Sequence, residues 1–126
     1  MGINFRKVLR SFRFAGQGIF DLFRYENNAK VHLLVAGAVG LAGGWLGLSR
    51  LEWAIILTQI GLVWFAEAIN TALEKLCDLV SPGHHPVVRA VKDMAAGAVL
   101  LLVLVAVVVG VLILGGRLLD RLQPGA

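Results

Sequence analysis

Three long apolar stretches constrain the fold of this chain more than any other feature. They cover residues 31–48, 53–73 and 94–115, and each comes close to the roughly 20 residues that a helix needs to cross a lipid bilayer. Hydrophobic residues make up 58% of the chain, which is well above the content of ordinary soluble domains. The sequence therefore predicts an all-α integral membrane protein with three transmembrane helices.

Chain length limits what else the protein can contain. Three spans and their connections use most of the 126 residues, so we expect one domain over residues 1–126 and no separate soluble module. Any chemistry must then be built from the membrane helices and their ends. The single cysteine, Cys77, has no partner for a disulfide or a zinc cluster, and we expect it to serve in packing.

Residues 1–30 have the pattern of an amphipathic helix that lies on the membrane surface. Apolar side chains recur there roughly every three to four residues. These residues are Phe5, Val8, Leu9, Phe12, Ile19, Phe20 and Phe23. Arginine and lysine recur through the same segment, which does not fit the apolar core of a cleavable signal peptide. Gly16 and Gly18 are the expected points of a break or bend.

Lysine and arginine are distributed unevenly between the two sides of the predicted spans. Nine of them lie before the first span or around the second connection: Arg6, Lys7, Arg10, Arg13, Arg24, Lys30, Lys75, Arg89 and Lys92. Three lie on the other side: Arg50, Arg117 and Arg121. Because cytoplasmic flanks carry the excess of positive charge, the sequence predicts a cytoplasmic N-terminus and a C-terminus outside. We therefore interpret the net charge of +4 as a sign of membrane orientation and not as a basic patch for nucleic acid, and we expect no nucleic-acid partner.

Polar side chains interrupt the end of the second span, in the segment WFAEAINTALEKLCD. Glu67, Asn70, Glu74 and Asp78 are spaced by three, four and four residues, which places them on one face of a helix. Carboxylates in line repel one another unless a cation or a proton intervenes. Since ionisable residues in a membrane segment are costly and usually face a polar interior, this stripe predicts a functional site.

The depth of each acid in the membrane suggests its role. Glu67 follows the apolar run IGLVWFA and is the candidate acceptor of a proton from a hydroxyl group. Glu74 lies nearer to water, and together with Glu26 it suits a hard cation such as Mg²⁺. The alternative is that the carboxylates reach toward water or pair with basic neighbours, namely Lys30, Lys75 and Arg89.

The second connection and the residues after it supply further candidates. Lys92 and Asp93 open the third span, where a lysine beside free backbone amides suits a phosphate, although a membrane-anchoring lysine is an equal alternative. His84 and His85 lie in the loop SPGHHPVV, and surface histidines are the simpler interpretation. The sequence contains no GxxxxGK[ST] motif and no protein-kinase glycine loop, so standard motifs do not establish nucleotide binding.

Three segments, ENNAKVH, EAINTALEKLCD and VKDMAAGAVLL, resemble the prokaryotic-type diacylglycerol kinase and undecaprenol kinase family. The resemblance is carried by E-x-x-N-T-x-x-E-x-x-x-D followed by K-D-x-x-A-x-A-V, and it extends over residues 5–115. It implies a homotrimer of three-span subunits with a surface helix, in the bacterial cytoplasmic membrane. The implied activity is transfer of the γ-phosphate of MgATP to the hydroxyl of a membrane lipid.

The resemblance also implies roles for individual residues. Glu67 matches the catalytic base, Asn70 matches the asparagine that orients the site, and Glu26 and Glu74 match the carboxylates that hold Mg²⁺ on the nucleotide. Asp78 matches a supporting acid. The implied contacts to ATP are Lys7, His84, His85, Lys92 and Asp93. The implied contacts to the lipid are Gln17 and Gly18, in the surface-helix region.

The identity of the lipid and the functional class both keep an alternative. ENNAKVH follows the E-x-N-x-x-x-H pattern of undecaprenol kinases, which slightly favours undecaprenol over diacylglycerol as the acceptor. The competing class is a non-enzymatic small membrane protein whose acidic stripe lines a cation pathway. Such a protein would move ions without turning over ATP.

Overall fold

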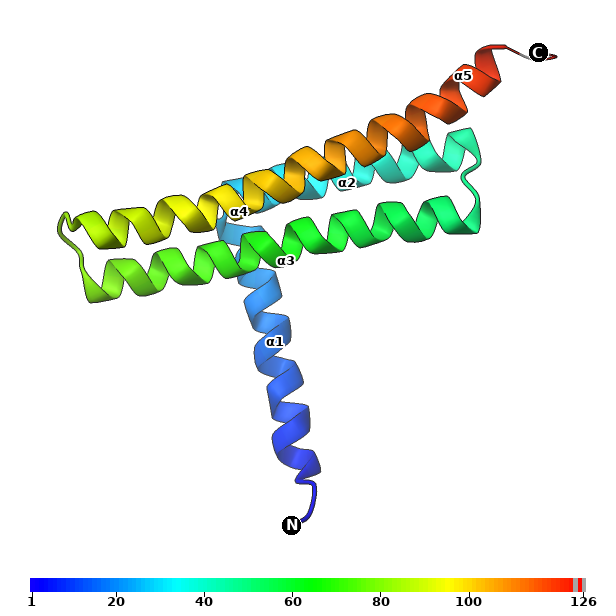
Figure 1. The fold of residues 1–126 in the computed structure, drawn as a ribbon. Coiled ribbons are helices and arrows are strands. Elements are labelled where there is room, and N and C mark those ends of the chain that lie inside the picture. The colour runs from blue at the N-terminus through cyan, green and yellow to red at the C-terminus, as the bar shows by residue number, and fades with distance from the viewer. Residues whose placement is uncertain (124, 126) are drawn as a thin grey trace.

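The computed structural model describes residues 1–123 and 125, and it is helical almost throughout. The elements are α1 (Phe5–Tyr25), α2 (Asn27–Leu46), α3 (Arg50–Val80), α4 (Pro86–Gly110), the π-helical segment η1 (Val111–Gly115) and α5 (Gly116–Leu122). The last three run on as one long rod (Figure 1). The described residues contain no β-strand.

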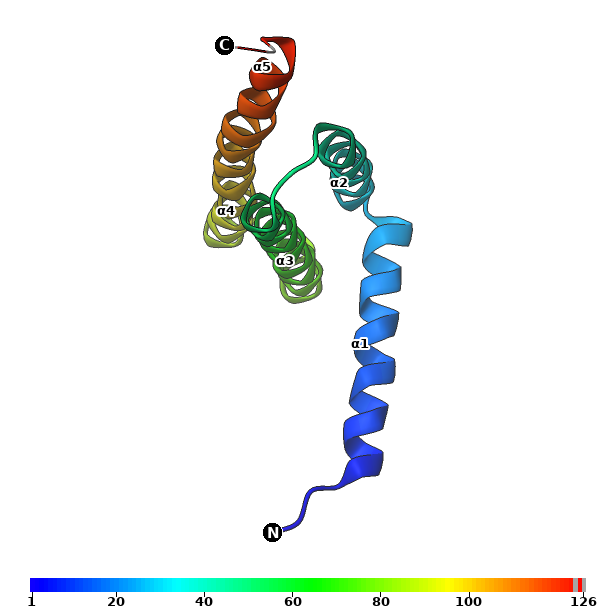
Figure 2. The ribbon, with the colours of Figure 1, turned by 90° about the vertical axis from the view of Figure 1, so that its right-hand side faces the viewer.

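Three of these helical stretches are long and apolar enough to cross a membrane: Asn27–Leu46, Arg50–Val80 and Pro86–Leu122. They form a bundle in which α3 packs most extensively on α4, while α1 projects away from the bundle (Figures 1 and 2). The predicted three-span, all-helical membrane architecture is confirmed. The second span, α3, continues to residue 80, and the third span begins with α4 at residue 86. The acidic stripe and Lys92 therefore all lie on regular helix.

The turn between α2 and α3 follows from a glycine and a serine. Gly47 ends α2 with φ 71° and ψ 56°, in the left-handed region that glycine adopts without a steric cost, and its N–H donates to the Gly43 carbonyl. Ser49 then begins α3 with a capping box, because its hydroxyl accepts from the Glu52 N–H while the Glu52 carboxylate accepts from the Ser49 N–H. These caps fix a tight antiparallel hairpin.

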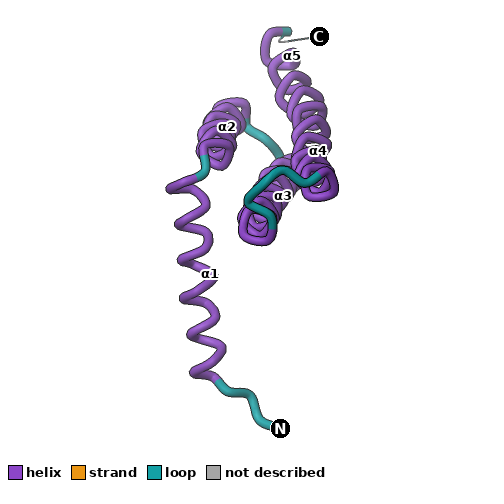
Figure 3. The backbone as a smooth tube through the Cα atoms, turned by 90° about the vertical axis from the view of Figure 1, so that its left-hand side faces the viewer, coloured by secondary structure: helices purple, strands orange, loops and turns teal. Residues whose placement is uncertain are grey.

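The connection between α3 and α4 covers only residues 81–85 (Figure 3). Ser81 closes α3 by donating its N–H to the Cys77 carbonyl. Pro86 occupies the first turn of α4, where the missing N–H of proline costs nothing. The Nδ1 atom of His85 accepts from the Val87 N–H at 3.2 Å. His85 therefore caps α4, and the two long helices lie antiparallel with their polar ends together.

The first helix, α1, is continuous from Phe5 to Tyr25, so the predicted break at Gly16 and Gly18 is wrong. Each glycine costs an isolated helix only about 1 kcal/mol, and the Asn4 side chain offsets part of this cost by capping the Lys7 N–H at 3.1 Å. None of the α1 residues is buried against the rest of the described chain.

Gly43 marks a tight contact between α2 and α3. A methyl group built there would lie 2.7 Å from the Trp53 ring and 2.9 Å from Leu48 Cδ1. Gly40 and Gly44 have the four-residue spacing that lets helices approach closely, yet no atom of the described residues would lie within 4 Å of such a methyl group at either position. Within one protomer, Gly43 is therefore the glycine that packing requires.

At the end of the bundle opposite the α3–α4 connection, the C-terminal rod is attached to the α2–α3 hairpin. The Arg117 guanidinium forms a bidentate ion pair with the Glu52 carboxylate, with Nε at 2.9 and 3.0 Å from the two oxygens. Arg121 lies over the Trp45 ring, 4.4 Å from its centroid, and donates to the Trp45 carbonyl at 2.6 Å. We call these four residues the C-terminal clamp.

Candidate functional site

The acidic stripe lies on α3 and grades from buried to exposed along the helix. Glu67 is the most deeply buried of its polar residues, with 2% of its surface exposed, and Asn70 is 6% exposed. Glu74 is half-buried and Asp78 lies further out. The predicted burial gradient is therefore present. An acid as enclosed as Glu67 needs a partner, because burying an isolated charge is costly.

The partner of Glu67 comes from α2. His32 Nε2 lies 3.6 Å from Glu67 Oε2, and the two side chains are 19% and 3% exposed respectively. His32 was missing from the residues predicted for the site, although it ends the motif ENNAKVH. The available signal was a polar residue close to the start of an apolar span, which is costly in a membrane and usually functional.

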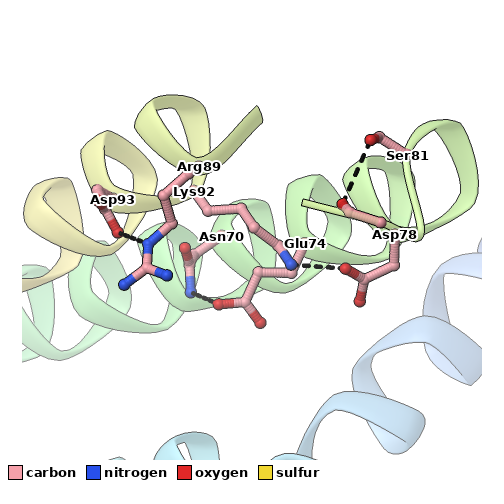
Figure 4. A network of polar contacts seen from close by, with 8 residues as sticks. Asn70, Glu74, Asp78, Ser81, Arg89, Lys92 and Asp93 are labelled. Atoms are coloured by element: carbon pink, nitrogen blue, oxygen red, sulfur yellow. Dashed lines mark hydrogen bonds and ion pairs between the residues drawn. The ribbon is translucent and has the colours of Figure 1, made fainter. Parts of the chain in front are cut away.

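One turn beyond Glu67, the amide of Asn70 connects to the next acid. Asn70 Nδ2 donates to Glu74 Oε1 at 3.4 Å (Figure 4). Its Oδ1 atom is buried and has no hydrogen-bond partner among the described residues, and the same holds for the hydroxyl of Thr71. Buried polar atoms without partners are rare in folded proteins. Both atoms therefore keep hydrogen-bonding capacity for a group outside the described residues, such as water or a ligand.

A basic residue of α4 reaches the outermost acid of the stripe. Lys92 Nζ donates to Asp78 Oδ1 at 2.5 Å, across the connection between the two helices (Figure 4). One position further along α4, Asp93 accepts from Arg89 Nε at 3.2 Å, in a pair that is about two-thirds exposed on both sides. Lys92 on α4 and the acids Asp78 and Glu74 on α3 are therefore neighbours at this end of the bundle (Figure 4), and the role of Lys92 at a phosphate stays a prediction.

Two further carboxylates predicted for the site are half-buried in the protomer. Glu74 lies two turns beyond Glu67 on α3, and Glu26 lies at the α1–α2 junction. Hard carboxylate oxygens of this kind fit a magnesium ion. The described residues contain no group of three acidic, histidine or cysteine side chains that would hold a metal by themselves. The donor set fits an ion that takes its other ligands from water and nucleotide phosphates.

An apolar cavity of about 590 Å³ begins beside this polar cluster and runs between α2, α3 and the C-terminal rod. His32 lies at one end of its lining, and Trp45 and Leu118 lie at the other. Aliphatic side chains such as Val35 and Val107 make up most of the wall. We call this space the tail cavity. Its size falls within the range of small-molecule sites, and its lining suits a hydrocarbon chain.

Several predicted site residues lie apart from the cluster in the protomer. Lys7 belongs to the first part of α1, which projects away from the bundle (Figure 2). Gln17 Nε2 donates to Asp21 Oδ1 at 2.8 Å on the same helix, and Gly18 has open space around it. His84 is exposed, and His85 is engaged in capping α4. The protomer does not bring these five residues to Glu67.

Three membrane-length apolar helices without strands in the described chain define a multi-pass membrane protein. The family model of prokaryotic diacylglycerol kinase matches residues 13–114. The chain belongs to this family of lipid kinases, and the resemblance inferred from its three motifs is confirmed.

The relatives carry two different names. The chain is 40% identical to the undecaprenol kinase of Bacillus subtilis (strain 168) over 107 residues. This alignment covers 85% of this chain and 87% of that relative. It is 38% identical to a diacylglycerol kinase of Synechocystis over 104 residues, and this alignment covers 82% of this chain and 59% of the relative. For the diacylglycerol kinase of Escherichia coli K12 the identity is 30% over 64 residues, or 51% of this chain and 52% of the relative.

Proposed function

We propose that this protein is an ATP-dependent membrane lipid kinase that transfers the γ-phosphate of MgATP to the hydroxyl of a membrane lipid alcohol. One observation carries the proposal. The buried carboxylate of Glu67 lies 3.6 Å from His32, which lines the end of an apolar cavity, and it begins a polar stripe on α3 that continues through Asn70 and Glu74 to the Asp78–Lys92 pair. A lipid and a phosphate donor can therefore meet at one carboxylate.

In this mechanism Glu67 accepts the proton of the lipid hydroxyl as the oxygen attacks the γ-phosphorus. General-base catalysis requires the base within hydrogen-bond reach of that proton, so the hydroxyl would lie beside His32, which lines the tail cavity 3.6 Å from the Glu67 carboxylate. Asn70 orients the stripe through its bond to Glu74. Because phosphoryl transfer depends mainly on positioning and electrostatics, a few helices are a sufficient scaffold.

The nucleotide side of the site is proposed for the residues nearest the α3–α4 connection. Glu26 and Glu74 would hold Mg²⁺, which supplies neutralisation of the phosphate charge when bound. Lys92 adds a positive charge at the phosphates, and Asp78 holds that lysine in position. Asp93, Lys7, His84 and His85 are further candidates for contact with ATP, and Gln17 and Gly18 for contact with the lipid. In a single protomer these six are not gathered around Glu67, so their roles depend on assembly.

Assembly and orientation form the second part of the proposal. We propose a homotrimer in the bacterial cytoplasmic membrane, with residues 1–126 acting as one domain and with the N-terminus in the cytoplasm. The distribution of lysine and arginine supports this orientation. The exposed apolar side chains of α1, such as Phe5, Phe12 and Phe20, support its placement on a membrane surface.

The acceptor is proposed to be undecaprenol in preference to diacylglycerol. Two observations favour this order, the E-x-N-x-x-x-H pattern of ENNAKVH and the higher identity to the relative named undecaprenol kinase. A tail cavity lined by interchangeable aliphatic side chains accepts either hydrocarbon chain, so it does not discriminate between them. Incubating the purified protein with MgATP and each lipid in matched micelles tests the order, and a preference for diacylglycerol would reverse it.

Glu67→Gln is the decisive variant for the activity itself. We expect it to lower transfer of labelled γ-phosphate to the lipid by more than about a hundredfold, because it removes the base without changing side-chain size. Thr58→Val is the matched control. Thr58 lies on the same helix, and its hydroxyl donates a hydrogen bond to the Ala54 carbonyl at 2.7 Å, one turn back on that helix. Full activity in Glu67→Gln would exclude Glu67 as the base. Cation flux into vesicles without ATP turnover would favour the competing class.

A further inference from the structure

His32 is the polar residue that connects the tail cavity to Glu67. Its side chain lines the cavity and is 19% exposed, so it is accessible to whatever occupies that space. The same imidazole brings Nε2 to 3.6 Å from Glu67 Oε2. Most of the remaining cavity wall is aliphatic. A lipid whose chain lies in the cavity would therefore meet His32 at the point where its polar end begins.

The other groups around Glu67 do not offer the same contact. Asn70 donates one of its two amide N–H groups to Glu74 and does not line the cavity, and the ionised carboxylates of Glu26 and Glu74 accept hydrogen bonds but do not donate them. Among the ion pairs of the described residues, Glu67 has His32 as its partner. His32 is thus the donor group that is paired with this acid.

We propose that His32 binds the acceptor hydroxyl directly, with its Nε2–H donating to the hydroxyl oxygen while that hydroxyl donates to Glu67. The proposal rests on the proposed lipid kinase function and assigns to it a residue that holds the alcohol. The hydrocarbon chain of the same lipid occupies the tail cavity. His32 then selects for a lipid that ends in an alcohol next to its apolar chain.

The distance between the two residues allows this arrangement. A separation of 3.6 Å is longer than a hydrogen bond, so the pair leaves bonding capacity on both atoms. Two atoms at this separation can both lie about 2.8 Å from one hydroxyl oxygen, which then completes a triangle with them. The hydroxyl is held by two contacts of defined direction, which places its oxygen for attack.

The chemical step balances without a change in the protonation of His32. The O–H bond of the alcohol breaks and its proton passes to Glu67, while a bond forms between the alcohol oxygen and the γ-phosphorus. The bond from that phosphorus to the bridging oxygen of ATP breaks, and ADP leaves. The N–H of His32 stabilises the negative charge that grows on the attacking oxygen, as a fixed donor does best in a water-poor site.

Steady-state kinetics with the alcohol and MgATP varied separately test this assignment. His32→Phe keeps a flat ring but removes the donor, and we expect kcat/KM for the alcohol to fall roughly 10- to 100-fold, the effect of losing one hydrogen bond to a charged group. The KM for MgATP should not change. His32→Gln keeps an N–H near the position of Nε2 and should recover a large part of the loss, whereas His32→Asn should not.

Trp64→Phe serves as the matched comparison. Trp64 also lines the cavity one turn before Glu67, and its Nε1 is buried without a hydrogen-bond partner among the described residues, so it is the competing donor. Its ring packs edge-on against Phe23 at 5.3 Å, a contact that phenylalanine retains. If Trp64→Phe lowered kcat/KM for the alcohol while His32→Phe did not, the assignment to His32 would be overturned.

Two outcomes separate this inference from the proposed function. Should Glu67→Gln abolish transfer while every His32 variant keeps wild-type kcat/KM for the alcohol, the lipid kinase stands and the role of His32 fails. Should the wild type transfer no phosphate to any lipid alcohol, the function itself fails. If His32→Phe does not fold, the comparison of His32→Gln with His32→Asn decides, because equal activity in those two contradicts a donor at Nε2.

Discussion

Lys92 Nζ lies 2.5 Å from Asp78 Oδ1, and this ion pair joins α4 to α3 across the 81–85 connection. The lysine side chain is about one-third exposed, and the aspartate about two-thirds. Lys92 is therefore held at the surface of the site by one partner that a phosphate group can readily replace. In the proposed kinase, Asp78 keeps the lysine extended toward the nucleotide before ATP binds.

Removing the charge of Lys92 should cost far more activity than removing that of Asp78. We expect Lys92→Met to lower lipid phosphorylation by at least about a hundredfold, because a fixed positive charge at the phosphates is lost. Asp78→Asn should raise the KM for MgATP by about three- to tenfold, since the lysine then samples more conformations. Kinetics with MgATP varied at saturating lipid measure both effects.

Arg89→Gln is the control for these two variants. Arg89 forms an exposed ion pair with Asp93 on the same helix, and such pairs contribute little. The activity of Arg89→Gln should therefore match that of the wild type within about twofold. An Asp78→Asn variant with an unchanged KM for MgATP would show that the pair with Lys92 is only a structural contact.

Glu26 and Glu74 should both control the requirement for magnesium. Because each is proposed to give one hard oxygen ligand, Glu26→Gln and Glu74→Gln should raise the Mg²⁺ concentration needed for half-maximal activity. Glu74→Gln should have the additional effect of loosening Asn70, whose amide donates to the Glu74 carboxylate at 3.4 Å. Titration of activity against free Mg²⁺ at constant ATP is the measurement. Unaltered titration curves in both variants would refute the metal assignment.

The two neighbouring glycines Gly43 and Gly44 should respond oppositely to alanine. Gly43→Ala introduces a methyl group 2.7 Å from the Trp53 ring, and overpacking of this kind typically costs about 1–3 kcal/mol. Gly44→Ala meets no atom within 4 Å in the described protomer and gains helix propensity, worth up to about 1 kcal/mol. Thermal unfolding in detergent distinguishes the two. A loss of stability in Gly44→Ala instead would reveal a contact with another subunit.

The C-terminal clamp should stabilise the bundle without affecting catalysis. Arg117→Lys keeps the charge but loses the bidentate geometry with Glu52, so we expect a lower midpoint of thermal unfolding and an unchanged KM for MgATP. Arg121→Gln should act in the same direction by removing the contact over Trp45. A large loss of activity at wild-type stability would contradict a purely structural clamp.

Local patterns in the sequence predicted the spans and the stripe because both depend on neighbouring residues. Twenty apolar residues in a row must be helical in a membrane, and the spacing of Glu67, Glu74 and Asp78 gives one face of any helix. The helix ends were less predictable. α3 extends past the apolar run to Val80 because regular helix satisfies its backbone until Ser81 provides an end.

Local sequence patterns did not predict the contacts between segments that are distant in the sequence. His32 meets Glu67 only because α2 packs beside α3 in one particular register, and Arg117 reaches Glu52 across 65 positions of sequence. Propensity and hydropathy carry no information about that register. Gly16 and Gly18 misled for a related reason, since their local cost is small compared with the cooperativity of a 21-residue helix.

The junction of α1 and α2 has a consequence for how this chain can vary in length. Glu26 is the sole residue between the two helices, and its N–H donates to the Leu22 carbonyl at 3.0 Å while its carbonyl accepts from the Lys30 N–H at 3.1 Å. Because this one extended residue sets the angle between the helices, inserting or deleting a residue there would change how α1 is placed against α2 and α3. The junction should therefore accept substitutions but no change in length.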